Sequence, residues 1–438
     1  MVAVVFGAIG FEADTVRMLA SWKEIGVFGL IVFVVFRAMT GKGPRVAITW
    51  IDLAVGALLL IAVAFFVAGN PWLRIELPPG AAIYGIRDIA FFLLLYFVGR
   101  ASPEIADDPD TLRRLYIITV LISAIAVVEW MLVTPDMLVL LGVAAYFQDF
   151  LNVSAFTAGN DFGLPMNYWT QIGSVNVQRA GSVFLSSQAF AVPFLILMPA
   201  ATMWFFSAVK RRNFTAWVAY AIIWLGLLLS ITRMTLIVCA LQILLLVLLL
   251  RRPEWAVGVL AVGFVALVIG FVLVPALPGF VWDTLTWQTG SSTSHIKDWS
   301  KGVDAFFTRP WGSGLGTTDQ SAMRFGLDPL TADNGYLKYA VELGIQGLIA
   351  HVLIFLGFGA TGLRLARHAS TESRRLLGIV VLVTTVGIMI NATTGVVFNS
   401  LLLAYLYFWF AGVAVTVAQR ESVPGTVRMP AALELAPA

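Results

Sequence analysis

Three arginines stand in or next to long apolar segments, where a charge usually has a partner or a function. Arg87 lies inside such a segment, Arg179 precedes one, and Arg233 lies in a short polar break between two. Guanidinium groups bind phosphate oxygens through paired hydrogen bonds, most strongly where water is scarce. The three side chains could therefore converge on one anionic group. Simpler alternatives are pairing of Arg87 with Asp88, snorkelling of Arg87, and an ordinary loop position for Arg179.

A candidate general base occurs in Thr331-Ala-Asp-Asn-Gly-Tyr-Leu337, at the start of another apolar segment. The Asp333 carboxylate would stay ionised near the arginines and could accept a proton from a hydroxyl group. Its alternative role is to cap the following helix, because Asp is among the preferred N-caps. Secondary candidates for the site are Asn334, Tyr336, Arg309, Lys338 and Glu342.

Other residues with possible chemistry have weaker patterns. The segment Arg309-Pro-Trp-Gly-Ser-Gly-Leu-Gly316 predicts a tight loop whose backbone amides could face an anion. His295 either contacts phosphate when protonated or is an ordinary loop histidine. Glu129 and Glu342 lie in or at the edge of apolar segments, where either could be the structural partner of a buried arginine. One cysteine, Cys239, and three scattered histidines predict neither a disulfide nor a metal site.

These residues must be positioned by apolar segments that cross a membrane. Of 438 residues, 59% are hydrophobic and 12% are charged. The apolar runs are about 17–25 residues long, as a spanning helix requires. They do not alternate with the period of two that a β-barrel would show. The sequence therefore predicts an all-α, polytopic transmembrane helical bundle of about 11–12 spans.

The predicted spans are 25–39, 47–68, 82–99, 115–134, 183–206, 214–231, 234–250, 255–276, 337–362, 376–391 and 399–418. Met1–Ala20 is either a short interfacial segment or part of a further span, and it lacks the basic start of a signal peptide. Residues 1–420 are expected to form a single membrane domain. Residues 421–438 are expected to form a disordered cytoplasmic tail.

Basic residues cluster in every second connection, and such connections are usually cytoplasmic. Basic clusters lie both before and after residues 214–250, so an even number of spans must separate them. The chain is therefore predicted to turn at Ser230–Arg233 on the outer side.

Two long segments, 135–182 and 277–336, then face outwards, and the C-terminus is cytoplasmic. Within these segments, Met137–Leu151 and Asp298–Phe307 are expected to lie along the membrane interface, because aromatic residues anchor at headgroup depth.

Four motifs together resemble the bacterial O-antigen ligase and polymerase superfamily. Leu229-Ser-Ile-Thr-Arg-Met-Thr-Leu236 is similar to its arginine-bearing turn, and Arg309–Gly316 is similar to the Pro-x-x-Gly-x-Gly segment of its large periplasmic loop. Asp333-Asn334, followed after nine residues by Gly344-Ile-Gln-Gly347, resembles its His-Asn-x9-Gly-x-x-Gly motif. Gln178-Arg-Ala-Gly-Ser-Val-Phe184 resembles its Arg-x-x-Gly-x-Phe element. The resemblance covers roughly residues 80–410.

The resemblance implies a GT-C-type glycosyltransferase in the bacterial inner membrane, with its active site facing the periplasm. Such an enzyme needs neither a metal nor a cofactor and inverts the anomeric carbon. It moves a glycan from undecaprenyl pyrophosphate to an acceptor hydroxyl. By this resemblance Arg233, Arg179, Arg87 and His295 would bind the pyrophosphate, and Asp333 would be the catalytic base.

Two departures from the family pattern separate the possible reactions. Asp333 stands where the ligases have histidine, and Ser294-His295 stands where the loop commonly has an arginine. The first departure favours a polymerase for O-antigen, capsule or exopolysaccharide over a ligase that uses lipid A-core or a protein. A transporter or flippase for lipid-linked sugars is an alternative of another class. It would more often show inverted repeats and charges near the midplane.

The expected partners follow from the polymerase hypothesis. They are an undecaprenyl-pyrophosphate-linked oligosaccharide, a glycan acceptor and membrane lipid, with a chain-length regulator as a further candidate. No nucleic acid is expected. The sugar, its linkage and the oligomeric state do not follow from the sequence.

Overall fold

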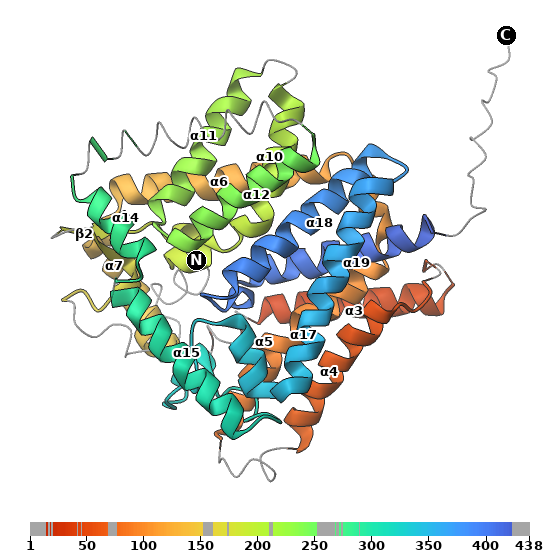
Figure 1. Ribbon diagram of the computed structural model, residues 1–438, viewed down its shortest axis with the longest axis horizontal. Helices are drawn as coiled ribbons and strands as arrows, with labels where there is room; N and C mark the ends of the chain where they lie inside the picture. The colour runs from red at the N-terminus through yellow and green to blue at the C-terminus, as the bar shows by residue number, and fades with distance from the viewer. Residues whose placement is uncertain are drawn as a thin grey trace.

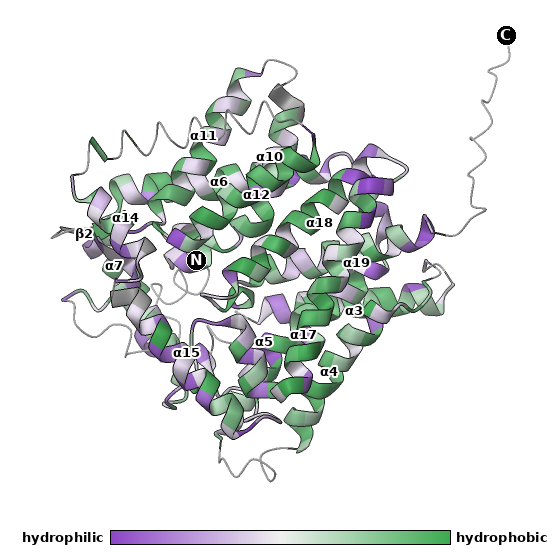
Figure 2. Ribbon diagram, in the orientation of Figure 1, coloured by the Kyte–Doolittle hydropathy of each residue, from purple (hydrophilic) through white to green (hydrophobic). Residues whose placement is uncertain are grey.

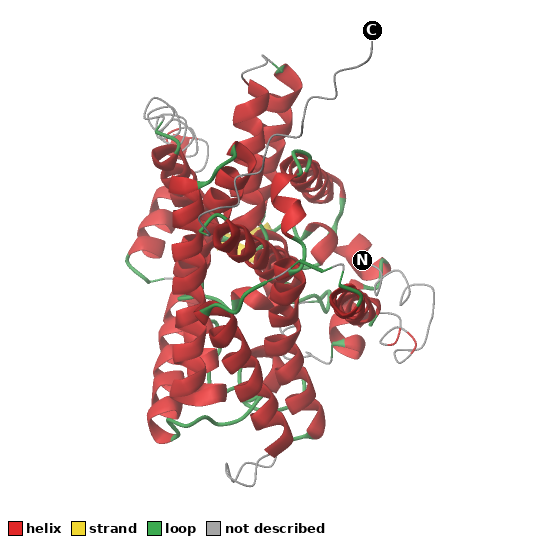
Figure 3. Cartoon of the chain, turned by 90° about the vertical axis from the view of Figure 1, so that its right-hand side faces the viewer, coloured by secondary structure: helices red, strands yellow, loops and turns green. Residues whose placement is uncertain are grey.

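The computed structural model describes residues 15, 18, 21–41, 43–44, 46–68, 77–151, 161–172, 175–209, 213–251, 268, 271–272, 275–288 and 290–422. Long helices pack side by side in this part of the chain, and its strands form one small hairpin (Figures 1 and 3). The helices of the bundle are α3 (Trp22–Met39), α4 (Trp50–Ala68), α5 (Pro79–Arg100), α6 (Thr111–Leu132), α9 (Ser187–Ala191), α10 (Phe194–Val209), α11 (Phe214–Leu229), α12 (Arg233–Leu249), α17 (Gly335–His368), α18 (Glu372–Asn391) and α19 (Leu401–Arg420).

Among the described residues, seven helical segments are long and apolar enough to cross a membrane. They are α4, α5, α6, α9 with α10, α17, α18 and α19, while α11 and α12 are shorter apolar helices. The prediction of an all-α polytopic membrane protein is confirmed. Helix α3 is not among the seven; it carries Lys23, Glu24 and Arg37 and packs Val27 against α5. The predicted span 255–276 and the segment Met1–Ala20 lie mostly outside the described residues, as does the tail after residue 422.

The predicted hairpin before Arg233 is confirmed. Helix α11 ends at Leu229, α12 begins at Arg233, and Ile231 between them has a φ of 47°. The Ser230 hydroxyl accepts from the Thr232 amide at 3.2 Å, which closes the turn. Two apolar helices are therefore joined by three residues, and Arg233 lies at the end of the bundle rather than within it.

Polar residues gather at two opposite sides of an apolar bundle (Figure 2). One side, the basic face, consists of connections 101–110 and 369–371 with the adjoining helix ends, which carry Arg37, Arg113, Arg114, Arg374, Arg375 and Arg420. The other, named the outer face because it carries the two segments predicted to face outwards, contains α7 (Pro135–Leu140), α14 (Leu277–Leu285) and α15 (Gly290–Thr308). It also carries short segments between α6 and α9, namely α8 (Val143–Ala145), η2 (Tyr146–Phe150), η4 (Met166–Tyr168), β1 (Trp169–Ile172), β2 (Val175–Gln178) and η5 (Ser182–Phe184). The two long outward segments of the prediction thus contain local structure of their own.

Helix α17 is broken at Gly344, where the backbone has φ 73° and ψ −170°. The glycine-rich segment fills the break. The amides of Ser313 and Gly314 donate to the carbonyls of Val341 and Glu342 at 2.7 and 3.1 Å, and the Ile345 amide donates to Pro310. A Cβ atom at Gly344 would lie 2.4 Å from the Trp311 backbone, so only glycine allows this approach.

The prediction that these amides face a bound anion is therefore wrong for Ser313 and Gly314. Their hydrogen bonds go to carbonyl groups that the helix break leaves without helical partners. The two glycine motifs therefore have a joint structural role. Gly344 allows the break in α17, and the Arg309–Gly316 segment forms hydrogen bonds with the backbone groups that the break exposes.

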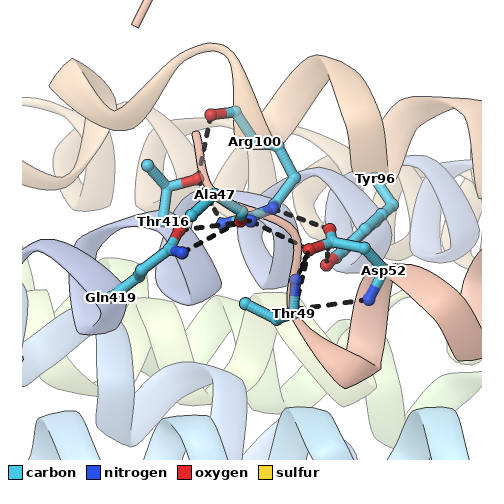
Figure 4. Close-up of polar contacts among 7 residues, drawn as sticks. All are labelled: Ala47, Thr49, Asp52, Tyr96, Arg100, Thr416 and Gln419. Carbon is cyan, nitrogen blue, oxygen red and sulfur yellow. Dashed lines mark hydrogen bonds and ion pairs between the residues drawn. The ribbon is translucent and has the colours of Figure 1, made fainter. Parts of the chain in front are cut away.

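A buried ion pair joins three helices near the basic face (Figure 4). The Arg100 guanidinium binds both carboxylate oxygens of Asp52, with Nε–Oδ1 at 2.9 Å and Nη2–Oδ2 at 3.0 Å. It also donates to the Thr416 hydroxyl at 2.8 Å and to the Ala47 carbonyl at 2.8 Å. Tyr96 donates to Asp52 as well, at 2.7 Å. Helices α4, α5 and α19 are therefore tied together at one level of the bundle.

Replacing Arg100 with methionine should destabilise the protein by about 3–5 kcal/mol, because the Asp52 carboxylate then stays buried without its cation. Thermal unfolding of the purified protein in nanodiscs measures the effect. Arg113→Met is the matched control, since the Arg113 side chain is 61% exposed. Adding Asp52→Asn to the Arg100 variant should restore part of the loss. Equal unfolding midpoints for the wild type and the Arg100 variant would exclude this role.

Candidate functional site

Arg179 is held at the outer face by the β-hairpin and by the α11–α12 turn. Strands β1 and β2 pair antiparallel with Trp169 opposite Gln178, and Arg179 follows directly. Its guanidinium donates to the Ser230 carbonyl at 2.8 Å, to the Thr232 hydroxyl at 3.0 Å and to the Asn167 carbonyl at 3.2 Å. All three acceptors are neutral. The positive charge of Arg179 is therefore fixed beside the turn that carries Arg233.

Glu129 of α6 holds the segment that follows Arg179. Its carboxylate accepts hydrogen bonds from the amides of Gly181 and Ser182, and the Ser182 hydroxyl donates to the Ile122 carbonyl at 2.7 Å. The Glu129 side chain is buried. The hypothesis that Glu129 partners a buried arginine is thus wrong, since backbone amides bind it. Through these amides it positions Arg179.

Replacing Glu129 with alanine should lower both stability and turnover. Two buried amides would lose their acceptor, at about 1–3 kcal/mol each. A displacement of Arg179 by about 1 Å could reduce the rate by about 10²-fold. Unfolding midpoints and initial rates of glycan transfer measure the two effects, and Glu129→Gln should restore part of both. Asp110→Ala, an exposed acid on the basic face, is the control. Wild-type rates in the alanine variant would refute the positioning role.

Arg233 extends from the start of α12 toward α14. Its Nη1 donates to the Thr284 hydroxyl at 2.9 Å, and its guanidinium lies over the Phe280 ring at 5.2 Å from the centroid. Thr284 and Phe280 are one helical turn apart, so the same face of α14 provides both contacts. The planar group is thereby oriented, as a site that recognises phosphate geometry requires.

His295 of α15 lies close to Asp333, which comes just before the start of α17. The His295 Nδ1 atom lies 3.5 Å from Asp333 Oδ2, and the Asp333 side chain is 43% exposed. Asp333 has a φ of 52° and does not cap α17. The cap is Asn334, whose side-chain oxygen accepts from the Leu337 amide at 2.9 Å. The capping alternative for Asp333 is therefore wrong, and its carboxylate is accessible at the outer face.

The charges of these groups influence one another. Partial burial and the neighbouring carboxylates of Asp319 and Asp298 raise the pKa of Asp333 to about 7. Burial lowers the pKa of His295, and the positive charge of Arg233 lowers it further, against the opposing effect of Asp298. Burial and then Arg233 lower the pKa of Arg179 to about 10. At neutral pH the arginine remains charged and the histidine is mostly neutral.

The structure thus brings Arg179, Arg233, His295 and Asp333 to one part of the outer face. Arg87 is bound differently. Its Nε lies 3.2 Å from Glu24 Oε1, and its guanidinium stacks on Tyr84 at 5.3 Å. The expected alternative, pairing with Asp88, is not the ion pair that forms.

Most of the secondary candidates have structural contacts. Asn334 also donates to the Thr393 carbonyl at 3.0 Å, and the Tyr336 hydroxyl donates to the Met389 carbonyl at 2.8 Å. Lys338 and Glu342 are buried, and Glu342 accepts from the Thr318 hydroxyl. Arg309 follows the last residue of α15. The hydrogen bonds of Asn334, Tyr336 and Glu342 hold the outer half of α17 against neighbouring segments.

Several contacts of the site were not predicted. Thr232, Thr284 and Phe280 orient the two arginines, and no local motif marks the latter two. The β-hairpin could have been found, because Trp-Thr-Gln-Ile and Val-Asn-Val-Gln flank a Gly-Ser pair. The hydrogen bonds of Glu129 to backbone amides could not have been predicted. Almost every residue has a backbone amide, so the sequence does not mark which amides a carboxylate will meet.

A comparison with known protein families finds a match to a segment that contains several residues of this site. Residues 218–352 match the family described as O-antigen ligase, and this range includes Arg233, His295, Asp333 and the Gly344 break. No curated protein matches the chain significantly. The match supports placing the chain in the bacterial O-antigen ligase and polymerase superfamily, which transfers lipid-linked glycans, and it does not separate the ligases from the polymerases.

Proposed function

We propose that the protein is a polysaccharide polymerase that transfers a glycan from undecaprenyl pyrophosphate to a hydroxyl of an acceptor repeat unit. The observation that carries the proposal is the placement of two oriented arginines, Arg179 and Arg233, on the same face as an accessible carboxylate, Asp333. The family match supports the lipid-linked donor. The polymerase branch rests on the aspartate at position 333, where the ligases have histidine.

The proposed reaction needs one base and one anion site. Asp333 accepts the proton of the acceptor hydroxyl, whose oxygen forms a bond to the anomeric carbon. The bond from that carbon to the pyrophosphate oxygen breaks, and undecaprenyl pyrophosphate leaves with the bonding electrons. Arg179 and Arg233 stabilise the charge that develops on the leaving group. Attack opposite the leaving group inverts the anomeric carbon.

His295 and Arg87 have different places in this proposal from those expected. His295, 3.5 Å from Asp333 and mostly neutral, lies beside the proposed base rather than binding pyrophosphate as a cation. Arg87, paired with Glu24, supports the packing of α3 on α5 and does not touch the donor. The pyrophosphate site is therefore assigned to Arg179 and Arg233.

A purified-protein assay with an undecaprenyl-pyrophosphate oligosaccharide tests the proposal. Longer lipid-linked products are expected from the donor alone, with one undecaprenyl pyrophosphate released for each transfer. Product that forms only after lipid A-core is added would support a ligase, which the name of the matching family also suggests. Movement of the donor across a vesicle membrane without any transfer would support a transporter and contradict both.

A further inference from the structure

Two cavities share a wall near the basic face. The first, of about 270 Å³, is lined by polar groups that include Arg37 of α3, Arg374 of α18 and Arg420 of α19. The second, of about 320 Å³, lies between α3, the segment before α4, and α5. Arg37, Gly43 and Pro44 line both cavities. The two spaces therefore form one site with two chemically different ends.

The second cavity is mainly apolar. Val34 and Ala38 line it from α3, Ile48 from the segment before α4, and Phe97 from α5. Its charged lining residues besides Arg37 are Asp52 and Arg100, which bind each other. This end of the site therefore has no unmatched charge and suits a hydrocarbon chain.

The first cavity has a positive charge that the described residues leave unmatched. Arg37 pairs with Glu104 at 3.4 Å, and Arg374 pairs with Asp107 at 2.8 Å. Arg374 also pairs with Glu421, so Arg37 and Arg374 together have three carboxylate partners among the described residues. In the described part of the chain, exposed Arg420 makes no ion pair.

Glu421, which follows Arg420, pairs with Arg374 rather than with Arg420. Its carboxylate binds Arg374 at 3.1 Å and the Ser370 hydroxyl at 2.5 Å, and it does not line the cavity. The polar end of the site therefore offers the guanidinium of Arg420 to a negatively charged group.

We propose that the two cavities together bind one anionic phospholipid of the adjacent leaflet. Its phosphate lies near Arg37 and Arg420, and an acyl chain lies along Val34, Ile48 and Phe97. Basic pockets beside membrane helices bind anionic headgroups in this way, and the headgroup and tail match the polar and apolar ends. The basic loops predict that this is the cytoplasmic leaflet. The site is separate from the proposed transfer site on the outer face.

Native mass spectrometry with phosphatidylglycerol and phosphatidylcholine of the same acyl chains tests the site. The wild type should bind phosphatidylglycerol about 5-fold more tightly, since a basic residue near a headgroup contributes about 1 kcal/mol. Arg420→Gln should remove this preference. Arg113→Gln, which changes another exposed arginine of the basic face, should retain it. Ala38→Trp, which fills the apolar end, should weaken binding of both lipids.

Three results of the lipid-binding measurements would each overturn the proposal. They are equal affinity of the wild type for both lipids, an unchanged preference in the Arg420 variant, and an equal loss in the Arg113 variant. Competition by glycerol 3-phosphate as strong as that by the intact lipid would also overturn it, because the apolar end would then contribute nothing. None of these measurements depends on glycan transfer.

Discussion

Replacing Arg233 with alanine should reduce kcat/KM for glycan transfer by about 10²–10³-fold, as the loss of one oriented donor to a developing oxyanion does in other enzymes. The guanidinium is oriented by Thr284 and Phe280, so Arg233→Lys should restore the charge but little of the rate. Initial rates with a defined lipid-linked donor measure both variants.

Two further variants make this prediction specific. Thr284→Val removes one neutral hydrogen bond to Arg233 and should cost about 2–10-fold, in line with about 0.5–1.5 kcal/mol for such a bond. Lys301→Met removes an outer-face cation that pairs with Asp328 at 2.6 Å and should leave the rate unchanged. If the lysine control lost as much activity as the Arg233 variant, a general effect of surface charge would replace the specific role.

Replacing Asp333 with asparagine should reduce kcat by about 10²–10⁴-fold, the usual contribution of a general base. KM should change little, because the proton moves only in the transition state. Asparagine tolerates a positive φ well, so the φ of 52° at this position does not prevent folding. A folded variant with wild-type kcat would show that another group accepts the proton.

The pH dependence gives an independent test of the same residue. With the pKa of Asp333 raised to about 7, the carboxyl group is protonated and inactive at lower pH. The kcat/KM of the wild type should therefore fall as the pH drops through about 7. Asp298→Asn removes a neighbouring negative charge, lowers the pKa of Asp333 and should shift this fall to lower pH. Retention of the same acid limb in Asp333→Asn would assign it to another group.

The hairpin between α11 and α12 could be predicted because its determinants are local. Basic clusters on both sides of residues 214–250 require a hairpin, and α11 and α12 turn where this argument puts the turn. The relative roles of Asp333 and Asn334 could not be predicted. Both residue types are good caps, and the choice depends on a backbone angle that positions Asn334 for the Leu337 amide.

Contacts between segments that are distant along the chain could not be predicted from the sequence. The glycines before residue 316 indicate that the backbone bends there. They do not indicate that this segment packs into a break of α17 at Gly344. Glu24 lies far from Arg87 along the chain, and another acid, Asp88, is adjacent to Arg87. A pairing argument based on sequence proximity therefore chose the wrong carboxylate.

The break in α17 also determines how deep the proposed chemistry lies. From Ile345 to His368 the helix is about 36 Å long at 1.5 Å per residue, which alone exceeds a hydrocarbon layer of about 30 Å. In the proposed orientation, with Ile345–His368 across the hydrocarbon layer, the outer part from Gly335 to Leu343 would stand at the level of the lipid headgroups. Lys338 and Glu342 thereby avoid the hydrocarbon, and Asp333 comes level with the phosphates of a lipid-linked sugar. An acceptor that approaches from water would meet its donor at that depth, with the polyprenyl chain still in the bilayer.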